Sequence, residues 1–206
     1  MKIFNFYNRI KDLVSELRQI EIFLRRFPDS KFYEKNEIDI LAYFKYHTEV
    51  FYHKIATILD ILKLMTNEIY ALGIPEKKCT WQELTARLNL KRTPELLVIE
   101  NYYKSFEHII TARHLNTHQA FYYDDDTEDI RFPLFMYKNI PDIENDYNFR
   151  RFHPKFLVKY RIKEFRKKRL EYVRSGNDVA EEYINQFINF ALPNFQRRRK
   201  SKSNGS

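Results

Sequence analysis

Residues 41–72 have the sequence LAYFKYHTEVFYHKIATILDILKLMTNEIYAL. Mostly apolar side chains recur in it at steps of three and four residues, the spacing that keeps them on one face of an α-helix. This seam comprises Leu41, Phe44, Thr48, Phe51, Ile55, Ile58, Leu62, Met65, Ile69 and Leu72. Gly73 and Pro75 come next and predict the end of the helix. A long helix that is apolar on one face needs other helices to cover that face.

Other segments supply such helices. A second seam runs over residues 6–27 and ends at Pro28. Thr80-Trp81-Gln82-Glu83 has the pattern of a capping box and predicts a short helix to about Asn89. Thr93-Pro94-Glu95 predicts the start of a further long helix, because proline is favoured in the first helical turn. The sequence therefore predicts an all-α, up-and-down helical bundle.

Composition agrees with helices and excludes several other classes of protein. The chain of 206 residues has only three glycines, so the tight turns that multi-stranded sheets need are scarce. Cys79 is the single cysteine, which excludes an internal disulfide framework. No apolar run reaches the roughly 18 to 20 residues needed to cross a bilayer, and residues 1–27 are charged throughout. We expect a cytoplasmic protein with no membrane association.

The chain divides into four parts at this level. Residues 1–123 should form the bundle, and residues 124–153 an irregular acidic connecting segment that begins with three aspartates and contains scattered prolines. Residues 154–192 should form basic C-terminal helices on or beside the bundle, one from Pro154 to about Arg174, closed by Gly176, and one from Asp178 to about Leu192. Residues 193–206 should be a disordered basic tail. The acidic stretch 124–146 either covers a functional site or connects helices.

Basic charge is concentrated at one end of the chain. The net charge is +8, but Arg150–Ser206 contains sixteen Lys or Arg and five Asp or Glu, a net of +11. The rest of the chain therefore carries −3. Such a concentration attracts phosphate backbones, although charge runs are commonly only solvated helix faces.

The helix that starts near Pro94 changes character towards its end. Its seam is Leu96, Ile99, Tyr103, Phe106 and Ile110, and the next steps of three and four fall on Arg113 and Thr117. An arginine on such a seam lies at an edge, pairs internally or faces an anionic ligand. His114 and His118 are four residues apart on one helical face, with Asn116 between them. Histidine is the usual general acid or base near neutral pH, so this cluster is the candidate site.

These residues resemble the defining motif of the HEPN family, helical bundles in which an arginine is followed, after four to six residues, by a histidine. Arg113 and His118 match with a spacer of four, and the residue after the arginine is polar, here His114. The resemblance covers roughly residues 1–123. It implies a metal-independent endoribonuclease without a cofactor, whose motifs meet across a homodimer interface. Arg113 and His118 would then be catalytic, with His114 and Asn116 as supporting residues.

The resemblance also implies a biological role. Many HEPN proteins are toxins or antiviral defence effectors, and some are restrained by an antitoxin or another regulatory protein. Some toxins of the family carry a modified tyrosine two residues after the motif histidine, whereas this chain has Ala120 there. Regulation by that route is therefore in doubt. RNA is the expected ligand, and the basic residues Arg166, Lys167, Lys168 and Arg169 either track its backbone or form a solvated face.

Two other interpretations stay open. His114 and His118 also have the helical spacing of a two-histidine zinc site, with Glu107 or an aspartate from 124–126 as a third ligand. Alternatively, the chain is a non-catalytic module that binds nucleic acid or a partner protein through its basic C-terminal region. Trp81, His47 and His53 are expected to be packing or surface residues.

Overall fold

The computed structural model describes residues 2–26, 31–88, 93–118 and 125–203, without the side chains of residues 31, 34, 88, 114–118, 125, 126, 128 and 198–203. The elements in chain order are α1 (Lys2–Arg25), α2 (Lys31–Lys35), α3 (Ile40–Tyr70), η1 (Glu76–Lys78), α4 (Trp81–Leu88), α5 (Pro94–His118), α6 (Asp125–Asn139), η2 (Ile143–Asn145), α7 (Tyr147–Phe152) and α8 (Lys155–Ser203). The described residues contain no β-strand, so the predicted all-α class is confirmed.

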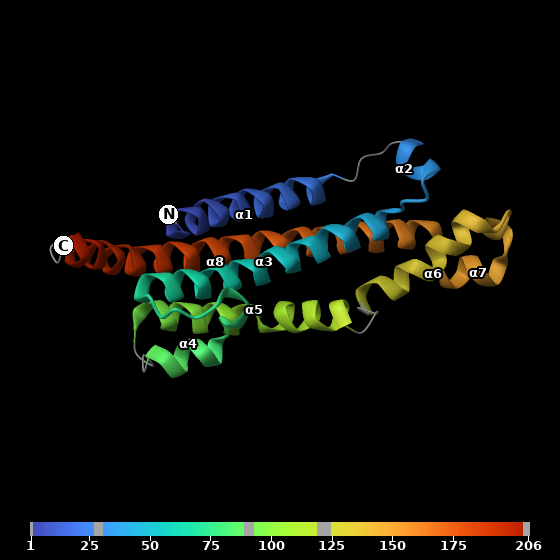
Figure 1. Cartoon of the computed structure of the whole chain (residues 1–206). Coiled ribbons are helices and arrows are strands. Elements are labelled where there is room, and N and C mark those ends of the chain that lie inside the picture. The colour runs from blue at the N-terminus through green and yellow to red at the C-terminus, as the bar shows by residue number, and fades with distance from the viewer. Residues whose placement is uncertain (1, 27–30, 89–92, 119–124, 204–206) are drawn as a thin grey trace.

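Four long helices run side by side in alternating directions (Figure 1). Helix α8 extends along the whole bundle and packs against α1, α3 and α5, while α3 packs against α1 and α5. The short helix α4 lies beside α3 near one end, and α6 and α7 lie at the opposite end, next to the start of α8 (Figure 1). None of the helices in the described ranges is both long enough and apolar enough to span a membrane.

Helix α3 is the centre of the core, as its seam predicted. Phe44, Phe51, Ile55 and Leu62 are fully buried. The seam of the first helix is also confirmed, since its residues from Ile10 to Leu24 are buried against α3 and α8.

The seam of α5 needs one correction. Tyr103 was predicted to be in the core but is 41% exposed, and the neighbouring Tyr102 is buried instead. The Tyr102 hydroxyl donates a hydrogen bond of 2.9 Å to the carbonyl oxygen of Ile55 on α3. A tyrosine can be buried completely when its hydroxyl finds such an acceptor, and that acceptor becomes available only when the helices pack.

The helix ends follow the predicted signals in part. Thr80 caps α4, because its hydroxyl accepts a hydrogen bond of 3.2 Å from the backbone N–H of Glu83. Helix α3 ends earlier than Gly73 suggested. The residue in the left-handed conformation that terminates it is Ala71, with φ of 46°, and Gly73 adopts a second positive φ of 67° in the turn that follows.

The largest correction concerns Gly176, which was expected to end a helix. Helix α8 instead continues through it to Ser203. A β-carbon at Gly176 would lie 2.6 Å from Cζ of the buried Phe51, so glycine is needed there for close approach of α8 to α3. The next residue, Asn177, is buried and donates a hydrogen bond of 3.1 Å to the carbonyl oxygen of Leu17 on α1.

The prediction of a disordered tail from residue 193 is also wrong for residues 193–203, because α8 continues through Pro193 to Ser203. Tertiary contacts explain why the helix continues. The Asn194 side-chain amide donates a hydrogen bond of 2.5 Å to Glu95, and the Tyr70 hydroxyl donates one of 3.1 Å to the same carboxylate. Glu95 is fully buried at the start of α5, and its charge together with burial raises the pKa of Tyr70 to about 12.

Residues 125–153 are mostly helical, which corrects the expectation of an irregular segment. Helix α6 contains Pro133, whose missing N–H leaves the carbonyl of Asp129 without its usual helical partner. The guanidinium of Arg161 on α8 donates a hydrogen bond of 3.3 Å to that carbonyl. A contact between distant residues thus offsets the local cost of proline.

A buried ion network joins α1 to α8. The side chain of Glu21 is 5% exposed and accepts hydrogen bonds from Arg25 at 2.8 Å and Arg174 at 3.0 Å. Arg18 lies 3.4 Å from Glu21 and binds Glu181 on α8 at 2.6 Å. Hydrogen bonding by Arg25, and then by Arg174, lowers the pKa of Glu21 to about 2, against the opposing effect of burial.

We expect Gly176→Ala to lower the free energy of unfolding by about 1–3 kcal/mol, because overpacking against Phe51 outweighs the helix propensity of alanine. Urea denaturation measures this. Phe51→Leu should reduce the additional cost of Gly176→Ala, and Ser175→Ala at the exposed neighbouring position is the matched control. A Gly176→Ala protein as stable as wild type would contradict the close approach.

Stability should depend on acidity through Glu21. Its lowered folded pKa contributes stability that is fully present above pH about 4.5 and is lost as the pH falls towards 2. Glu21→Gln should therefore cost about 1–3 kcal/mol at pH 6 and progressively less towards pH 3, measured by urea denaturation. Glu171→Gln, at an exposed position on α8, is the control. An equal cost at both pH values would refute the assignment.

Candidate functional site

The candidate motif lies in the last turns of α5. The backbone of this helix is described through His118, so Arg113, His114, Asn116 and His118 all belong to its final six residues. Upstream, Tyr102, Phe106 and Ile109 anchor the helix in the core. The motif begins shortly after this buried stretch of α5, at the point where the sequence indicated a change from apolar to polar residues.

Arg113 forms a long ion pair with a residue of α3. Its side chain is 31% exposed, and its Nη1 lies 3.8 Å from Oδ2 of Asp60 on α3. Asp60 is itself half-exposed and also pairs with Lys63 at 2.7 Å. Ion pairs this accessible to water contribute about 0–1 kcal/mol, so the contact with Asp60 by itself stabilises this position of Arg113 only weakly. Of the three situations predicted for a seam arginine, the structure supports an edge position with an ion pair inside the chain.

Arg113 also lines a groove of about 890 Å³ bounded by α3, α5 and the segment η1–α4. The charged lining residues are balanced in sign and are Lys63, Lys77, Lys104, Arg113, Asp60, Glu76, Glu100 and Glu107. Trp81 and Tyr103 line it as well. Trp81 also packs against the core, as predicted. The groove gives access to the motif arginine but does not by itself form a positive track.

The side chains of His114, Asn116 and His118 lie outside the described part of the chain, and so does Ala120. Their predicted roles therefore stay predictions. The described backbone shows only that His118 follows Arg113 by five residues on the same helix.

Two residues near the motif were not singled out from the sequence. Asp60 sits on the exposed side of α3, so nothing in its local pattern marks it as the partner of Arg113. His108, also on α5, has its Nε2 2.8 Å from the hydroxyl of Tyr172 on α8. The Arg113–Asp60 and His108–Tyr172 contacts each join two different helices, so residue spacing in the sequence could not predict them.

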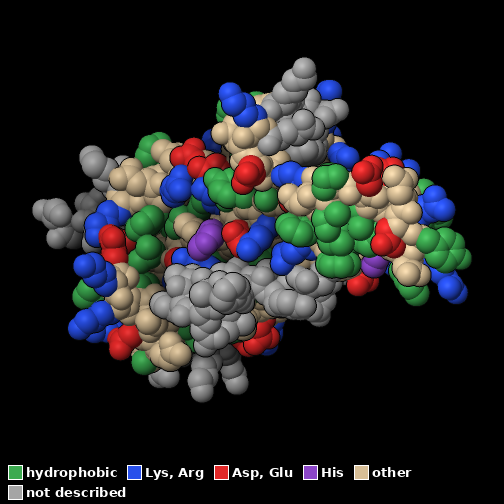
Figure 2. All heavy atoms as spheres, turned by 90° about the vertical axis from the view of Figure 1, so that its right-hand side faces the viewer, with side chains coloured by type: hydrophobic (Ala, Val, Ile, Leu, Met, Phe, Trp, Pro, Cys, Tyr) green, Lys and Arg blue, Asp and Glu red, His purple; other side chains and the backbone are tan. Residues whose placement is uncertain are grey.

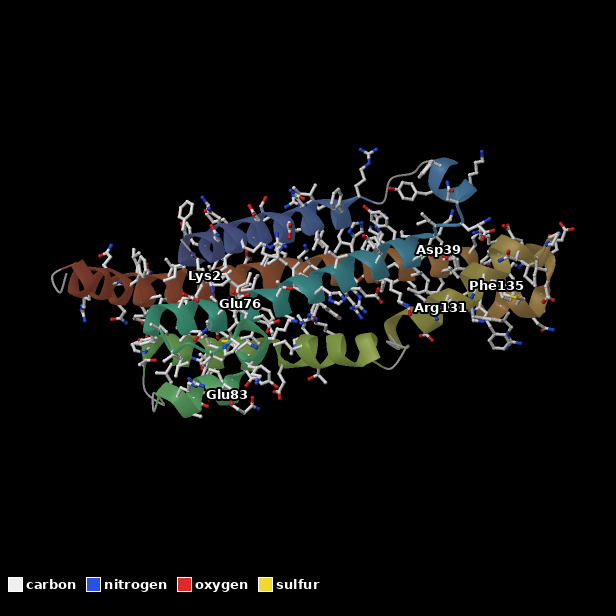
Figure 3. All side chains as sticks on the ribbon, in the orientation of Figure 1. Lys2, Asp39, Glu76, Glu83, Arg131 and Phe135 are labelled. Atoms are coloured by element: carbon white, nitrogen blue, oxygen red, sulfur yellow. The ribbon has the colours of Figure 1, made fainter. Side chains whose placement is uncertain are left out.

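The predicted RNA-contacting residues 166–169 do not share one environment. Lys167 and Lys168 are exposed, whereas Arg166 and Arg169 are half-buried. The Arg169 guanidinium lies 5.4 Å from the Phe165 ring, and Arg169 lines a cavity of about 240 Å³ between α3, α6 and α8. Asp39 and Arg131 line the same cavity, and Figure 3 labels both at this end of the bundle.

The alternative metal site involves residues on α5 and in the segment that follows it. Among the described residues, no group of three or more His, Cys, Asp or Glu side chains is arranged to hold a metal ion. The zinc interpretation depends on His114, His118 and the aspartates 124–126, whose side chains the structure does not describe. Among the candidate zinc ligands, the structure describes only the side chain of Glu107, which is exposed. His47, by contrast, packs between aromatic rings 5.1 Å and 4.4 Å away on Phe23 and Tyr43, and burial lowers its pKa.

Fold and motif together define an all-α bundle with an Arg-x4-His sequence in the last turns of one of its long helices. The Cthe2314-like HEPN family matches residues 4–140, about two thirds of the chain. The protein belongs to this HEPN family, and the match reaches beyond residue 123 to include α6. Membership connects it in general terms with RNA-related nuclease modules. No curated protein and no solved structure matches it significantly.

Proposed function

We propose that the protein is a metal-independent endoribonuclease. The observation that carries this proposal is that a member of the HEPN family presents Arg113 and His118, in the family's Arg-x4-His spacing, near the end of α5. The Arg113 side chain is partly exposed and lines the groove beside α5, and a guanidinium in such a place is suited to bind a phosphate. RNA is the proposed substrate, and no cofactor is required.

The proposed reaction is attack by a ribose 2′-hydroxyl on the adjacent phosphorus. A new bond forms between the 2′-oxygen and phosphorus, and the bond to the 5′-oxygen of the next nucleotide breaks. His118 assists proton transfer to or from these oxygens, and Arg113 stabilises the additional negative charge of the transition state. His114 and Asn116 orient the phosphate or the histidine. DNA lacks the 2′-hydroxyl and is not cut.

A homodimer would complete the site. Positions five apart on a straight helix project about 140° apart, so a two-fold interface that brings α5 against its symmetry mate would combine Arg113 of one subunit with His118 of the other. The accessible groove beside Arg113 leaves room for an RNA strand to reach it.

By family resemblance, the cellular role is that of a toxin or antiviral defence effector. An antitoxin or another regulatory protein would restrain it. With Ala120 two residues after His118, restraint by modification of a tyrosine at that position does not apply to this chain.

A non-catalytic module that binds nucleic acid is the second candidate. It is favoured by the net charge of +11 between Arg150 and Ser206, which does not involve the motif. RNA binding without any cleavage would support this function over the first.

Purified wild type should cut total RNA in the presence of EDTA and leave single-stranded DNA intact. Arg113→Ala and His118→Ala should each reduce the cleavage rate by at least about a hundredfold while the circular dichroism spectrum is unchanged. Arg9→Ala and His53→Ala, at exposed positions on α1 and α3, are matched controls that should retain activity. Cleavage that EDTA abolishes would favour the metal interpretation.

A mixture of subunits tests the composite site. Arg113→Ala and His118→Ala chains co-expressed with different tags should form heterodimers that retain one intact Arg113–His118 pair. We expect the mixture to recover about a quarter of wild-type activity, because half of the dimers are mixed and each has one of two sites. If Arg113 and His118 act within one chain, mixing recovers nothing.

A further inference from the structure

The outer face of α8 near its start combines exposed aromatic rings with lysines. Phe156 is 74% exposed and Tyr160 is 58% exposed. With Lys163 and Lys167 they follow steps of four, three and four residues, so the four side chains share one helical face. Lys159 borders this face and is also exposed. We call these five residues the α8 stripe.

The stripe is opposite the buried side of the helix. Val158, Phe165 and Val173 point into the bundle and are buried, so the orientation of α8 is fixed by the core. Leaving large aromatic side chains in water forgoes about 1.5–3 kcal/mol of burial for each ring. The arrangement is therefore costly unless a ligand covers these rings.

The segment of the chain that carries the stripe is strongly basic. Tyr147–Arg169 contains ten Lys or Arg and one Asp or Glu, a net of +9 in 23 residues. Further exposed aromatic residues lie at this end of the molecule, namely Phe132, Phe135, Tyr147 and Phe152. Figure 2, which views this end, shows hydrophobic and basic side chains interspersed over its surface. A polyanion with flat apolar groups complements such a surface in both respects.

We propose that the α8 stripe binds single-stranded RNA, with bases stacked on Phe156 and Tyr160 and phosphates paired with Lys159, Lys163 and Lys167. Unpaired bases present the free ring faces that stacking requires, whereas a duplex hides them. An anionic membrane surface fits less well, because the stripe has only two aromatic residues beside three lysines and contains no aliphatic residue. The choice of RNA rests on the proposed function.

This assignment would divide the work between two parts of the chain. The groove beside Arg113 is balanced in charge and holds RNA weakly by electrostatics, whereas the stripe lies on a strongly basic segment outside the region that matches the family. The stripe would therefore supply affinity for the strand, and the motif on α5 the chemistry.

Binding is measured with the full chain carrying His118→Ala, so that RNA stays intact, and a fluorescent U12 RNA followed by anisotropy. Phe156→Ala/Tyr160→Ala should weaken binding at least tenfold at fixed salt. Phe4→Ala, which removes an equally exposed ring at the far end of the bundle, should change it less than twofold. Lys159→Gln/Lys163→Gln should lower the salt slope by about 1.4, and Lys11→Gln/Lys78→Gln should not.

Three outcomes would overturn the inference: unchanged binding by the aromatic double variant, an equal loss with Phe4→Ala, or stripe-dependent binding to phosphatidylcholine–phosphatidylserine vesicles but not to U12. A 12-base-pair RNA duplex bound as tightly as U12 would also contradict stacking. Cleavage by the otherwise wild-type chain is scored separately. Stripe-dependent U12 binding without any RNA cleavage would refute the nuclease and leave the stripe standing.

Discussion

The close approach of α8 to α3 at Gly176 is the contact on which the rest of the bundle depends. Because no β-carbon separates the α8 backbone from the Phe51 ring, the two helices can pack directly at the middle of the molecule. Asn177 then reaches the backbone of α1 at Leu17, and Arg174 reaches the buried Glu21. A single continuous helix can therefore contact α1, α3 and α5 along their length. Two shorter helices with a break at this point would lose that arrangement.

The charged residues of the scaffold, Glu21 and Glu95, are in a different environment from the motif residue Arg113. Glu21 and Glu95 are almost inaccessible and each is bound by two or more side chains from different helices. Removing a partner from such a group leaves a charge without compensation, which makes these contacts specific. Arg113 instead has a half-exposed side chain and a long contact to a solvated carboxylate. Glu21 and Glu95 are thus held inside the scaffold by partners from several helices, whereas Arg113 lies at the edge of the groove beside α5.

The charge distribution separates the chain into two regions with different physical properties. The family region, residues 4–140, contains the motif and a groove with balanced charges. Basic residues are concentrated in α7 and the first half of α8, which extend the bundle beyond that region. The hydrogen bond from Arg161 to the α6 carbonyl at Asp129 ties this basic end to the family region.

The sequence by itself determined the all-α class, the seams of α1 and α3, the N-cap at Thr80, the start of α5 at Pro94 and the placement of the Arg113–His118 motif at the end of a bundle helix. These features depend on local spacing, and helical periodicity and capping act within a few residues. Only the tertiary structure decided that α8 is continuous through Gly176 and Pro193, that α6 is helical despite Pro133, and that Asp60 faces Arg113. Each of these features depends on a contact with a residue far away in the sequence, such as Phe51, Glu95 or Arg161. Local sequence cannot predict which distant side chain will satisfy a missing hydrogen bond or fill the space beside a glycine.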